Sequence, residues 1–401
     1  MTWLRKELEK QEMELEKEEE EKISFSNQSR ILLEEKLLGY QRFRVSFLAT
    51  ALIVPPAFKE LCRHGDRKPD SLLESYEADP YKDENFDGTL TDNGRKRELD
   101  LGKFLRSKYN EFLGSTYVPG CIEARSTNAN RTKESANLIL EGLYPGAVIP
   151  VISKFQLNDA LLYPQLCPGY LKNYLEAKSD TRKEREELKE CMEHLTNSTG
   201  QTINSTLDMY LLYVTLDAEH CMNFELPSWT SDIYPDGDLL KGTLLEFHIQ
   251  NYNEKMIIKN GGKFINKIRE DMESVKSGEM DKNRKLMLYV AHDLNIVAVL
   301  KGLDVFDPHV PKYSASLILE LHLIDETYHV KIEYYLGMPA ELKTLQIPGC
   351  AEICPLDQFS TLMEKYIPSG FDWLCDKMRG FGNLVEAFSE TVEKFKQLFG
   401  K

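Results

Sequence analysis

Helical and strand-like patterns of apolar residues alternate along the chain from about residue 58. A helix is predicted after Thr91-Asp92, because Leu101, Leu105 and Tyr109 recur at helical spacing behind a capping residue. Lys285–Val290 has the pattern of a buried strand and leads into a helix that ends near Leu300. The other short predictions are a helix over Arg131–Leu143 and strands over Ala147–Ile152, Ala315–Ile324 and Tyr328–Tyr335.

Residues 161–284 differ from the rest, because they contain charged helical patterns and almost no strand pattern. Helices are expected there over Asp180–Glu193, Gly242–Met256 and Gly262–Val275. Strands that alternate with helices, interrupted by a helical segment, predict an α/β fold. We expect a three-layer α/β/α sandwich with a mixed central sheet, formed by residues 58–160 and 285–401. Residues 161–284 would be a helical cap insertion.

Residues 1–57 form an atypical charged extension. Leu4–Lys22 is a run of Glu and Lys, which is typical of a solvated helix or of disorder. Val45–Val54 is apolar, follows Arg42 and Arg44 and resembles a signal peptide in length and flanks, although it lies inside the chain. It is too short to span a bilayer, so no transmembrane helix is expected. A buried strand is the alternative interpretation of this run.

The composition limits the function. The chain has 401 residues, 42% of them hydrophobic and 29% charged, as in an ordinary soluble globular protein. Its formal net charge of −15 argues against a nucleic acid partner, since binding to a phosphate backbone needs a basic surface. An anionic substrate would therefore need a local basic pocket that works against the overall field.

The cysteines and glycosylation acceptors favour an oxidising compartment. The eight Cys residues are spread along the chain without a C-x-x-C pair, which fits disulfides better than a metal site. Asn197 and Asn204 are two Asn-x-Ser/Thr acceptors in the polar run Thr196–Thr206, which has the composition of an exposed loop. Together these features predict a secreted or lumenal protein with glycosylation at Asn197 or Asn204.

Three segments carry candidate chemistry: Arg63-His64-Gly65-Asp66-Arg67, Arg125-Ser126-Thr127 and His292-Asp293. Ligands of open α/β sheets bind where strand ends converge, and His292-Asp293 follows a predicted strand. Arg63, Arg67 and Arg125 offer charged planar donors that suit the oxygens of a phosphate group. An imidazole among these cations keeps its lone pair at mildly acid pH, because nearby positive charges lower its pKa. A protonated Asp293 is a candidate general acid.

Each segment taken alone also has a structural explanation. An Arg-His-Gly tripeptide arises by chance, and a His-Asp pair at a strand end is often a hydrogen-bonded surface pair. A metal site is the weaker interpretation, since His64 and His292 would supply two ligands at most and no other His or Cys has convincing ligand spacing.

The wider pattern resembles the histidine acid phosphatases, within the histidine phosphatase superfamily. Arg63–Pro69 fits the signature R-H-G-x-R-x-P, and Leu90–Leu105 is similar to the L-T-x-x-G…L-G-x-F-L helix of that family. Arg125–Ala136 resembles its R-S-T-x-x-x-R-T-x-x-S-A segment, and Tyr289–Leu300 resembles the strand with its second histidine. These elements occur in order over roughly residues 60 to 376, most like the prostatic and lysosomal branch and its insect relatives.

The resemblance implies an acid phosphatase that hydrolyses small phosphate monoesters through a phosphohistidine, without a metal or another cofactor. It makes His64 the nucleophile, Asp293 the general acid, and Arg63, Arg67, Arg125 and His292 the ligands of the phosphate. It also implies disulfides between Cys350 and Cys354 and between Cys167 and Cys375. Cys191 with Cys221 is a further guess, which leaves Cys62 and Cys121 as candidate free thiols. A secreted or lysosomal location is expected, and a homodimer is one open oligomeric state.

The chain departs from the family where an apolar strand should precede Arg63. Pro55-Pro56 and the charged pair Lys59-Glu60 make a poor central strand. Three explanations stay open: a short strand over Phe58–Cys62, recruitment of Val45–Val54, or an aberrant N-terminus that misplaces His64. Leu294-Asn295 is a second departure, since polar residues such as Thr-Thr are usual there. Two alternatives to a general acid phosphatase also remain: a phosphatase specific for phytate or a lysophospholipid, and an inactive secreted binding protein.

Overall fold

The computed structural model describes residues 57–70, 76–84, 86–337, 341–369 and 394. The predictions for Leu4–Lys22 and Val45–Val54 lie outside the described residues. No helix among the described residues is long and apolar enough to cross a bilayer.

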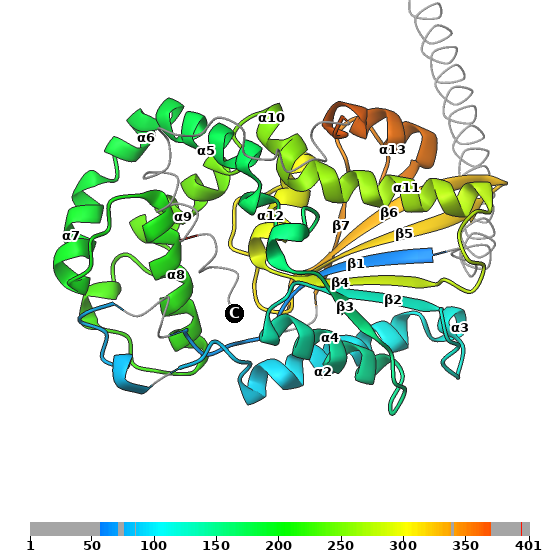
Figure 1. Cartoon of the computed structure of the whole chain (residues 1–401), viewed down its shortest axis with the longest axis horizontal. Helices are drawn as coiled ribbons and strands as arrows, with labels where there is room; N and C mark the ends of the chain where they lie inside the picture. The colour runs from blue at the N-terminus through cyan, green and yellow to red at the C-terminus, as the bar shows by residue number, and fades with distance from the viewer. Residues whose placement is uncertain (1–56, 71–75, 85, 338–340, 370–393, 395–401) are drawn as a thin grey trace, which may run out of the picture. The chain divides into compact units, whose positions relative to one another are not determined.

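A mixed sheet forms the centre of the fold (Figure 1). Its strands follow the order β3-β2-β4-β1-β5-β6-β7, and β8 pairs with β6. The strands β3, β2, β4 and β1 run parallel, whereas β1 with β5 and the later pairs are antiparallel. The strands are β1 (Ala57–Arg63), β2 (Ile122–Ser126), β3 (Val151–Ser153), β4 (Leu286–Ala291), β5 (Ser316–Ile324), β6 (Thr327–Tyr335), β7 (Leu342–Leu345) and β8 (Ile353–Pro355).

Helices cover both faces of this sheet (Figure 1). Side chains alternate between the two faces of a strand, so β1 contributes to two apolar cores. Phe58 and Cys62 belong to the core beneath α2 and α4, whereas Ala57 and Leu61 belong to the core shared with α11 and α12. The predicted three-layer sandwich with a mixed sheet is confirmed. The helices of these layers are α2 (Asp92–Lys108), α3 (Asn110–Leu113), α4 (Asn130–Leu143), α11 (Lys263–Ser277), α12 (Asp293–Gly302) and α13 (Leu356–Met363).

The segment predicted as a cap is helical between β3 and α11. The helix expected over Asp180–Glu193 is wrong as a single element, because the structure breaks it at Thr181 and again before Lys189. Thr196–Thr199 is also helical rather than part of a loop, and α11 lies against the sheet, where Asp271 pairs with Lys59. The cap helices are α5 (Pro168–Asp180), α6 (Arg182–Glu186), α7 (Lys189–Thr199), α8 (Thr206–Cys221), α9 (Asp238–Ile249) and α10 (Glu254–Ile257).

The strand that the sequence made doubtful is present, and it lies in the middle of the sheet. β1 pairs with β4 on one side and β5 on the other, which confirms the short-strand explanation. Lys59 and Glu60, which made the strand doubtful, are buried but have partners. The Lys59 ammonium contacts the Asp271 carboxylate, and Glu60 accepts a 2.6 Å hydrogen bond from the Ser316 hydroxyl. Burial lowers the pKa of Lys59 to about 8 and raises the pKa of Glu60 to about 7.

The disulfide predictions have mixed outcomes. Cys350 and Cys354 are bonded, as predicted. Cys167 is also in a disulfide, but its predicted partner Cys375 lies outside the described residues, so that pairing stays a prediction. The guess that Cys191 pairs with Cys221 is wrong, since both are free thiols. Burial raises the pKa of both thiols, and the acidic charge that adds most to the rise is Asp238 for Cys191 and Asp217 for Cys221. Cys62 and Cys121 are buried free thiols.

Candidate active site

The two candidate histidines follow neighbouring parallel strands. Arg63 ends β1, His64 follows it, and His292 follows Ala291 at the end of β4. Arg63 is in register with Ala291, and the His64 amide donates a 3.1 Å hydrogen bond to the Ala291 carbonyl. The imidazole centroids are therefore only 5.4 Å apart. The segments lie at the carboxyl ends of parallel strands, as predicted.

The loop after His64 packs directly on the first turn of α2. A Cβ atom at Gly94 would lie 2.1 Å from the Asp66 carbonyl oxygen, so only glycine permits this approach. The Thr91 amide donates a 2.9 Å hydrogen bond to that same carbonyl, and the Thr91 hydroxyl caps the helix at Gly94. This contact explains why the helix motif accompanies the histidine motif: it fixes the loop that carries His64 and Arg67.

His64 presents one defined nitrogen to the site. Its Nδ1 lies 2.9 Å from the Gly65 carbonyl, which is an acceptor only, so Nδ1 holds the proton and Nε2 holds the lone pair. Burial and then the charge of Arg131, with further contributions from His292, Arg63 and Arg67, hold the pKa of His64 well below its usual range. The imidazole therefore stays neutral at acid pH. A neutral Nε2 among fixed cations is the state that a nucleophile toward phosphorus requires.

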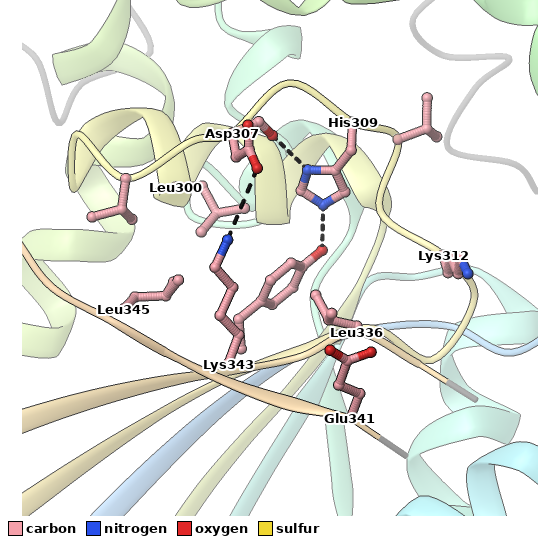
Figure 2. A pocket seen from close by; sticks show the side chains of 11 residues that line it. Leu300, Asp307, His309, Lys312, Leu336, Glu341, Lys343 and Leu345 are labelled. Atoms are coloured by element: carbon pink, nitrogen blue, oxygen red, sulfur yellow. Dashed lines mark hydrogen bonds and ion pairs between the residues drawn. The ribbon is translucent and has the colours of Figure 1, made fainter. Parts of the chain in front are cut away.

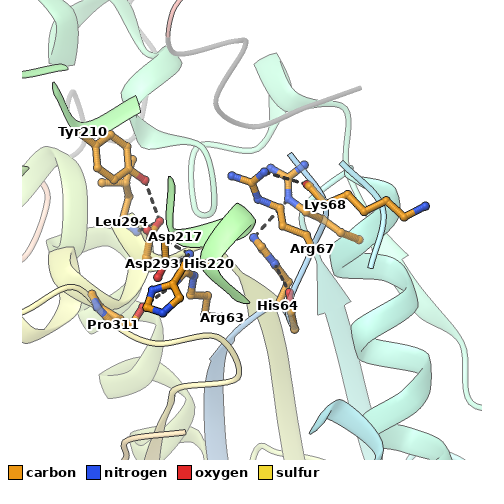
Figure 3. Close-up of polar contacts among 12 residues, drawn as sticks. Arg63, His64, Arg67, Lys68, Tyr210, Asp217, His220, Asp293, Leu294 and Pro311 are labelled. Atoms are coloured by element: carbon orange, nitrogen blue, oxygen red, sulfur yellow. Dashed lines mark hydrogen bonds and ion pairs between the residues drawn. The ribbon is translucent and has the colours of Figure 1, made fainter. Parts of the chain in front are cut away.

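Four cationic or imidazole side chains surround His64. Arg131, on the first turn of α4, donates from Nε to the His64 Nε2 at 3.2 Å. Burial and then Arg131 also lower the pKa of His292, and Arg63 and Arg67 add to the effect. His292 Nε2 lies 3.0 Å from the Thr127 hydroxyl, which orients the ring. Arg63 and Arg67 lie on either side of His64 in Figure 3.

Arg125 pairs with a buried carboxylate and not with His64. Its Nη2 donates to both carboxylate oxygens of Asp159 at 3.1 Å, and the Asp159 side chain is almost fully buried. Arg125 is not among the charges that dominate the pKa of His64. The segment predicted to supply one phosphate ligand thus contains two arginines, of which Arg131 is the one in contact with His64. The role of Arg125 as a phosphate ligand stays a prediction.

The two oxygens of Asp293 have different surroundings (Figure 3). Oδ1 accepts a 2.9 Å hydrogen bond from the Tyr210 hydroxyl and a 2.8 Å hydrogen bond from the Leu294 amide. Oδ2 is buried without a hydrogen-bond partner and lies 3.7 Å from Nη2 of Arg63. An acid proton would therefore reside on Oδ2, which faces the arginine cluster. Neither the Tyr210 contact nor the pairing of Arg131 with His64 was predicted.

Asn295 has a structural role at this helix end. Its side-chain oxygen accepts from the His292 amide at 3.2 Å, and its amide group donates to the Leu162 carbonyl at 3.0 Å. Asn295 therefore caps the first turn of α12, at one of the two positions where the sequence departs from the family pattern it resembles.

The loop of residues 303–315 contacts the Arg63 guanidinium through a backbone carbonyl and an aromatic ring. The Pro311 carbonyl accepts a hydrogen bond from Arg63 Nη1, and the Tyr313 ring stacks 3.9 Å from the guanidinium carbon. His309 of this loop contacts β6, since its Nε2 lies 2.8 Å from the Tyr334 hydroxyl (Figure 2).

A cavity of about 320 Å³ lies beside that contact, lined by Leu300, Val305, Lys312, Lys343 and their neighbours. Neither His64 nor His292 lines it.

Metal binding has no visible basis in the part of the chain that the structure describes. There, no three His, Cys, Asp or Glu side chains are grouped closely enough to hold an ion. The charges that face His64 and His292 are those of arginine side chains.

Comparison with known proteins places this geometry in a family. Residues 57–335 match the sequence model of the histidine phosphatase superfamily, branch 2. The chain is 37% identical over 355 residues to the venom acid phosphatase Acph-1 of Apis mellifera, covering 83% of this chain and 91% of that protein. It is 30% identical over 343 residues to the prostatic acid phosphatase of Rattus norvegicus, covering 79% and 87%.

Solved structures show the same fold at lower identity. The Klebsiella sp. ASR1 phytase superimposes with a TM-score of 0.61 at 18% identity, covering 81% of this chain and 98% of that one. The Hafnia alvei phytase gives a TM-score of 0.61 at 16% identity, covering 78% and 97%. These similarities concern the fold alone. With the family match over residues 57–335 and the paired histidines at the strand ends, this chain belongs to branch 2 of the histidine phosphatase superfamily.

Proposed function

We propose that this chain is an acid phosphatase that hydrolyses phosphate monoesters through a phosphohistidine at His64. One observation carries the proposal: Arg131 Nε lies 3.2 Å from a buried His64 Nε2 whose neighbouring cations keep the imidazole neutral. Arg63, Arg67, Arg131 and His292 would bind the phosphate oxygens, and the transferred group would displace the Arg131 contact with Nε2. The acid phosphatases among its relatives support the same activity.

The reaction would have two steps. His64 Nε2 attacks phosphorus, the P–N bond forms as the P–O ester bond breaks, and the proton on Asp293 Oδ2 passes to the leaving alcohol. Water then attacks the phosphorus of the phosphohistidine, and a P–O bond forms as the P–N bond breaks. One water proton passes to Asp293, and inorganic phosphate leaves His64 with its lone pair restored. The arginines stay charged throughout and stabilise the charge that spreads over the phosphoryl oxygens.

The intact β1 strand argues against the inactive binding protein. The arrangement of β1 between β4 and β5 places His64 beside His292, whereas an aberrant strand would have separated them.

The test of the phosphohistidine is a rapid-quench experiment with radiolabelled nitrophenyl phosphate at acid pH, followed by alkaline digestion and mass analysis. We expect an acid-labile, base-stable phosphate on the peptide that contains His64. Turnover without label on that peptide would contradict the phosphohistidine, and absence of turnover would contradict the activity.

We propose that the protein enters the secretory pathway and is secreted or lysosomal. The disulfides at Cys350–Cys354 and at Cys167 support an oxidising compartment. Asn197 and Asn204 have exposed side chains, as an acceptor for a glycan requires. Protein from a secreting cell line should therefore shift on a gel after glycosidase treatment, and the shift should shrink in Asn197→Gln or Asn204→Gln. An unshifted band would contradict glycosylation.

We also propose that two copies pair through β3, which would give the homodimer that the sequence left open. β3 lies at the edge of the sheet, where a strand has unpaired backbone groups. Large apolar side chains are exposed on and beside it: Val148 at 92%, Ile152 at 52%, Phe155 at 61% and Leu157 at 53%. Clustered exposure of this kind is typical of an interaction surface. Sedimentation should give a dimer for the native chain and a monomer for Ile152→Lys, and a monomeric native chain would contradict the pairing.

A further inference from the structure

A second carboxylate faces the arginine cluster from the cap. Asp217, near the end of α8, has Oδ2 3.9 Å from Nη2 of Arg63, and Asp293 has Oδ2 3.7 Å from the same nitrogen (Figure 3). Both carboxylates therefore lie on the side of Arg63 from which the leaving group would be protonated. The mechanism proposed above uses Asp293 and gives Asp217 no role.

The surroundings of Asp217 are acidic and aromatic apart from Arg63 and Arg67. Burial raises the pKa of Asp217. The positive charges of Arg63 and Arg67 oppose this rise, and the negative charges of Asp293 and Asp66 add to it. Three tyrosines are affected by the charge of Asp217: Tyr213 of the same helix, Tyr234 and Tyr313. Burial raises their pKa values, and the Asp217 charge adds to that rise. Tyr234 also contacts Nδ1 of His220 at 3.1 Å. The Asp217 side chain is 23% exposed, so a substrate can reach it.

A bound phosphate changes the charge balance at this point. In the empty site Arg63 offsets both carboxylates, but a phosphate dianion would take up the charge of Arg63. The ionised Asp217 then lies beside the leaving group without compensation. It repels a leaving group with further negative charge and attracts one with a positive charge. The nearby tyrosine rings also favour an organic cation, through the negative charge of their faces.

We propose that Asp217 makes the enzyme selective for phosphate monoesters of amino alcohols, whose leaving group carries an ammonium group. This inference rests on the proposed phosphatase function and names a substrate class for it. It also predicts poor turnover of polyphosphorylated substrates such as phytate, whose remaining phosphates would face Asp217. Because burial raises the pKa of Asp217, the preference should be weaker at strongly acid pH, where this carboxyl is protonated.

The experiment compares two esters of the same shape. Phosphocholine carries a quaternary ammonium group where 3,3-dimethylbutyl phosphate carries a neutral carbon. We expect kcat/KM of the purified full chain to favour phosphocholine by roughly two- to fivefold at pH 6.5, and the ratio to fall toward one at pH 4. Asp217→Asn should bring the ratio near one at both pH values. Asp232→Asn, which removes an exposed carboxylate between α8 and α9, is the matched control and should keep the native ratio.

Binding without turnover provides an independent measurement. In His64→Ala, calorimetry should show tighter binding of phosphocholine than of 3,3-dimethylbutyl phosphate, and Asp217→Asn added to this variant should remove the difference. Equal kcat/KM for the two esters in the native chain, with both hydrolysed, would overturn the inference and leave the phosphatase standing. Hydrolysis of neither ester, nor of nitrophenyl phosphate, would overturn the phosphatase and the inference together. A ratio unchanged by Asp217→Asn would overturn the role of Asp217.

Discussion

The Tyr210 hydroxyl donates a 2.9 Å hydrogen bond to Oδ1 of Asp293, and this contact joins the middle of α8 to the first residue of α12. Together with the Leu294 amide it occupies Oδ1 and leaves Oδ2 without a donor. Tyr210 thereby selects which oxygen carries the acid proton and where that proton points. It acts on Asp293 and not on the phosphate, so it is a positioning residue.

Tyr210→Phe should lower kcat for an alkyl phosphate by roughly tenfold, since a hydrogen bond to a charged group contributes about 1.5–3 kcal/mol. The alkaline limb of the kcat profile should also move to higher pH, because a carboxyl group that loses a donated hydrogen bond keeps its proton longer. Steady-state kinetics from pH 4 to 8 would measure both. Tyr328→Phe, at the far end of β6, should change neither. A merely structural Tyr210 would lower kcat without moving the limb.

The roles of His64 and Asp293 can be distinguished by the activity that each variant loses on different substrates. His64→Ala removes the nucleophile and should leave almost no turnover with any monoester. Asp293→Asn removes only proton donation, a loss of roughly 10²–10⁴-fold for alkyl phosphates, whose leaving oxygen is strongly basic. The loss should be smaller for nitrophenyl phosphate, because its phenolate leaves more easily without a proton. Equal losses for both esters, in protein shown to be folded, would remove Asp293 from the mechanism.

Competitive inhibition by inorganic phosphate distinguishes the two arginines of the β2–α4 segment. Arg131→Gln removes a donor beside His64, and we expect the inhibition constant to rise by roughly 10–100-fold. Arg125→Gln should change it by less than about threefold. That variant should instead lower the melting temperature, because it leaves the buried Asp159 without its charged partner. The reverse order of the two inhibition constants would make Arg125 the phosphate ligand, as the sequence suggested.

The pH profile follows from the neutral nucleophile. Burial and the nearby arginines lower the pKa of His64, so its lone pair persists well into the acid range. Asp293 must be protonated to act, and a carboxyl group loses its proton as pH rises. Activity should therefore be highest at acid pH, decline toward neutrality, and fall again at very low pH. Rates that still rise between pH 5 and pH 8 would contradict Asp293 as the acid.

Glu60 should make the fold more stable at acid pH. Burial raises its pKa to about 7 in the folded chain, above its ordinary value of 4.5, so the folded state binds the proton more tightly than the unfolded state. Its contribution to stability is fully present below about pH 4.5 and is lost as pH rises toward 7, a difference of roughly 3 kcal/mol. Glu60→Gln should raise the melting temperature at pH 8 and change it little at pH 4. Glu326→Gln, in an exposed turn, is the control. An equal effect of Glu60→Gln at both pH values would refute the shift.

The sequence by itself determined the architecture and most of the chemistry of this protein. Alternating helix and strand patterns predicted the layered fold, since a periodic apolar pattern specifies which face of each element is buried. The residues of Arg63–Pro69 and His292-Asp293 are adjacent in sequence to the strands that carry them. Local order along the chain was therefore enough to place His292 at a strand end, whereas the strand before His64 was settled only by the pairing of β1 with β4 and β5.

Only the tertiary structure decided which side chains meet. The charged pair in β1 looked unsuited to a central strand, yet Asp271 and Ser316, both more than 200 residues away, provide partners for it. The sequence assigned Arg125 to the phosphate and gave Arg131 no role, yet Arg125 pairs with Asp159 and Arg131 contacts His64. Tyr210 and Asp217 belong to a helix whose pattern is merely apolar, and their position beside Asp293 and Arg63 depends on how α8 packs. Such contacts join distant segments, and no local pattern encodes them.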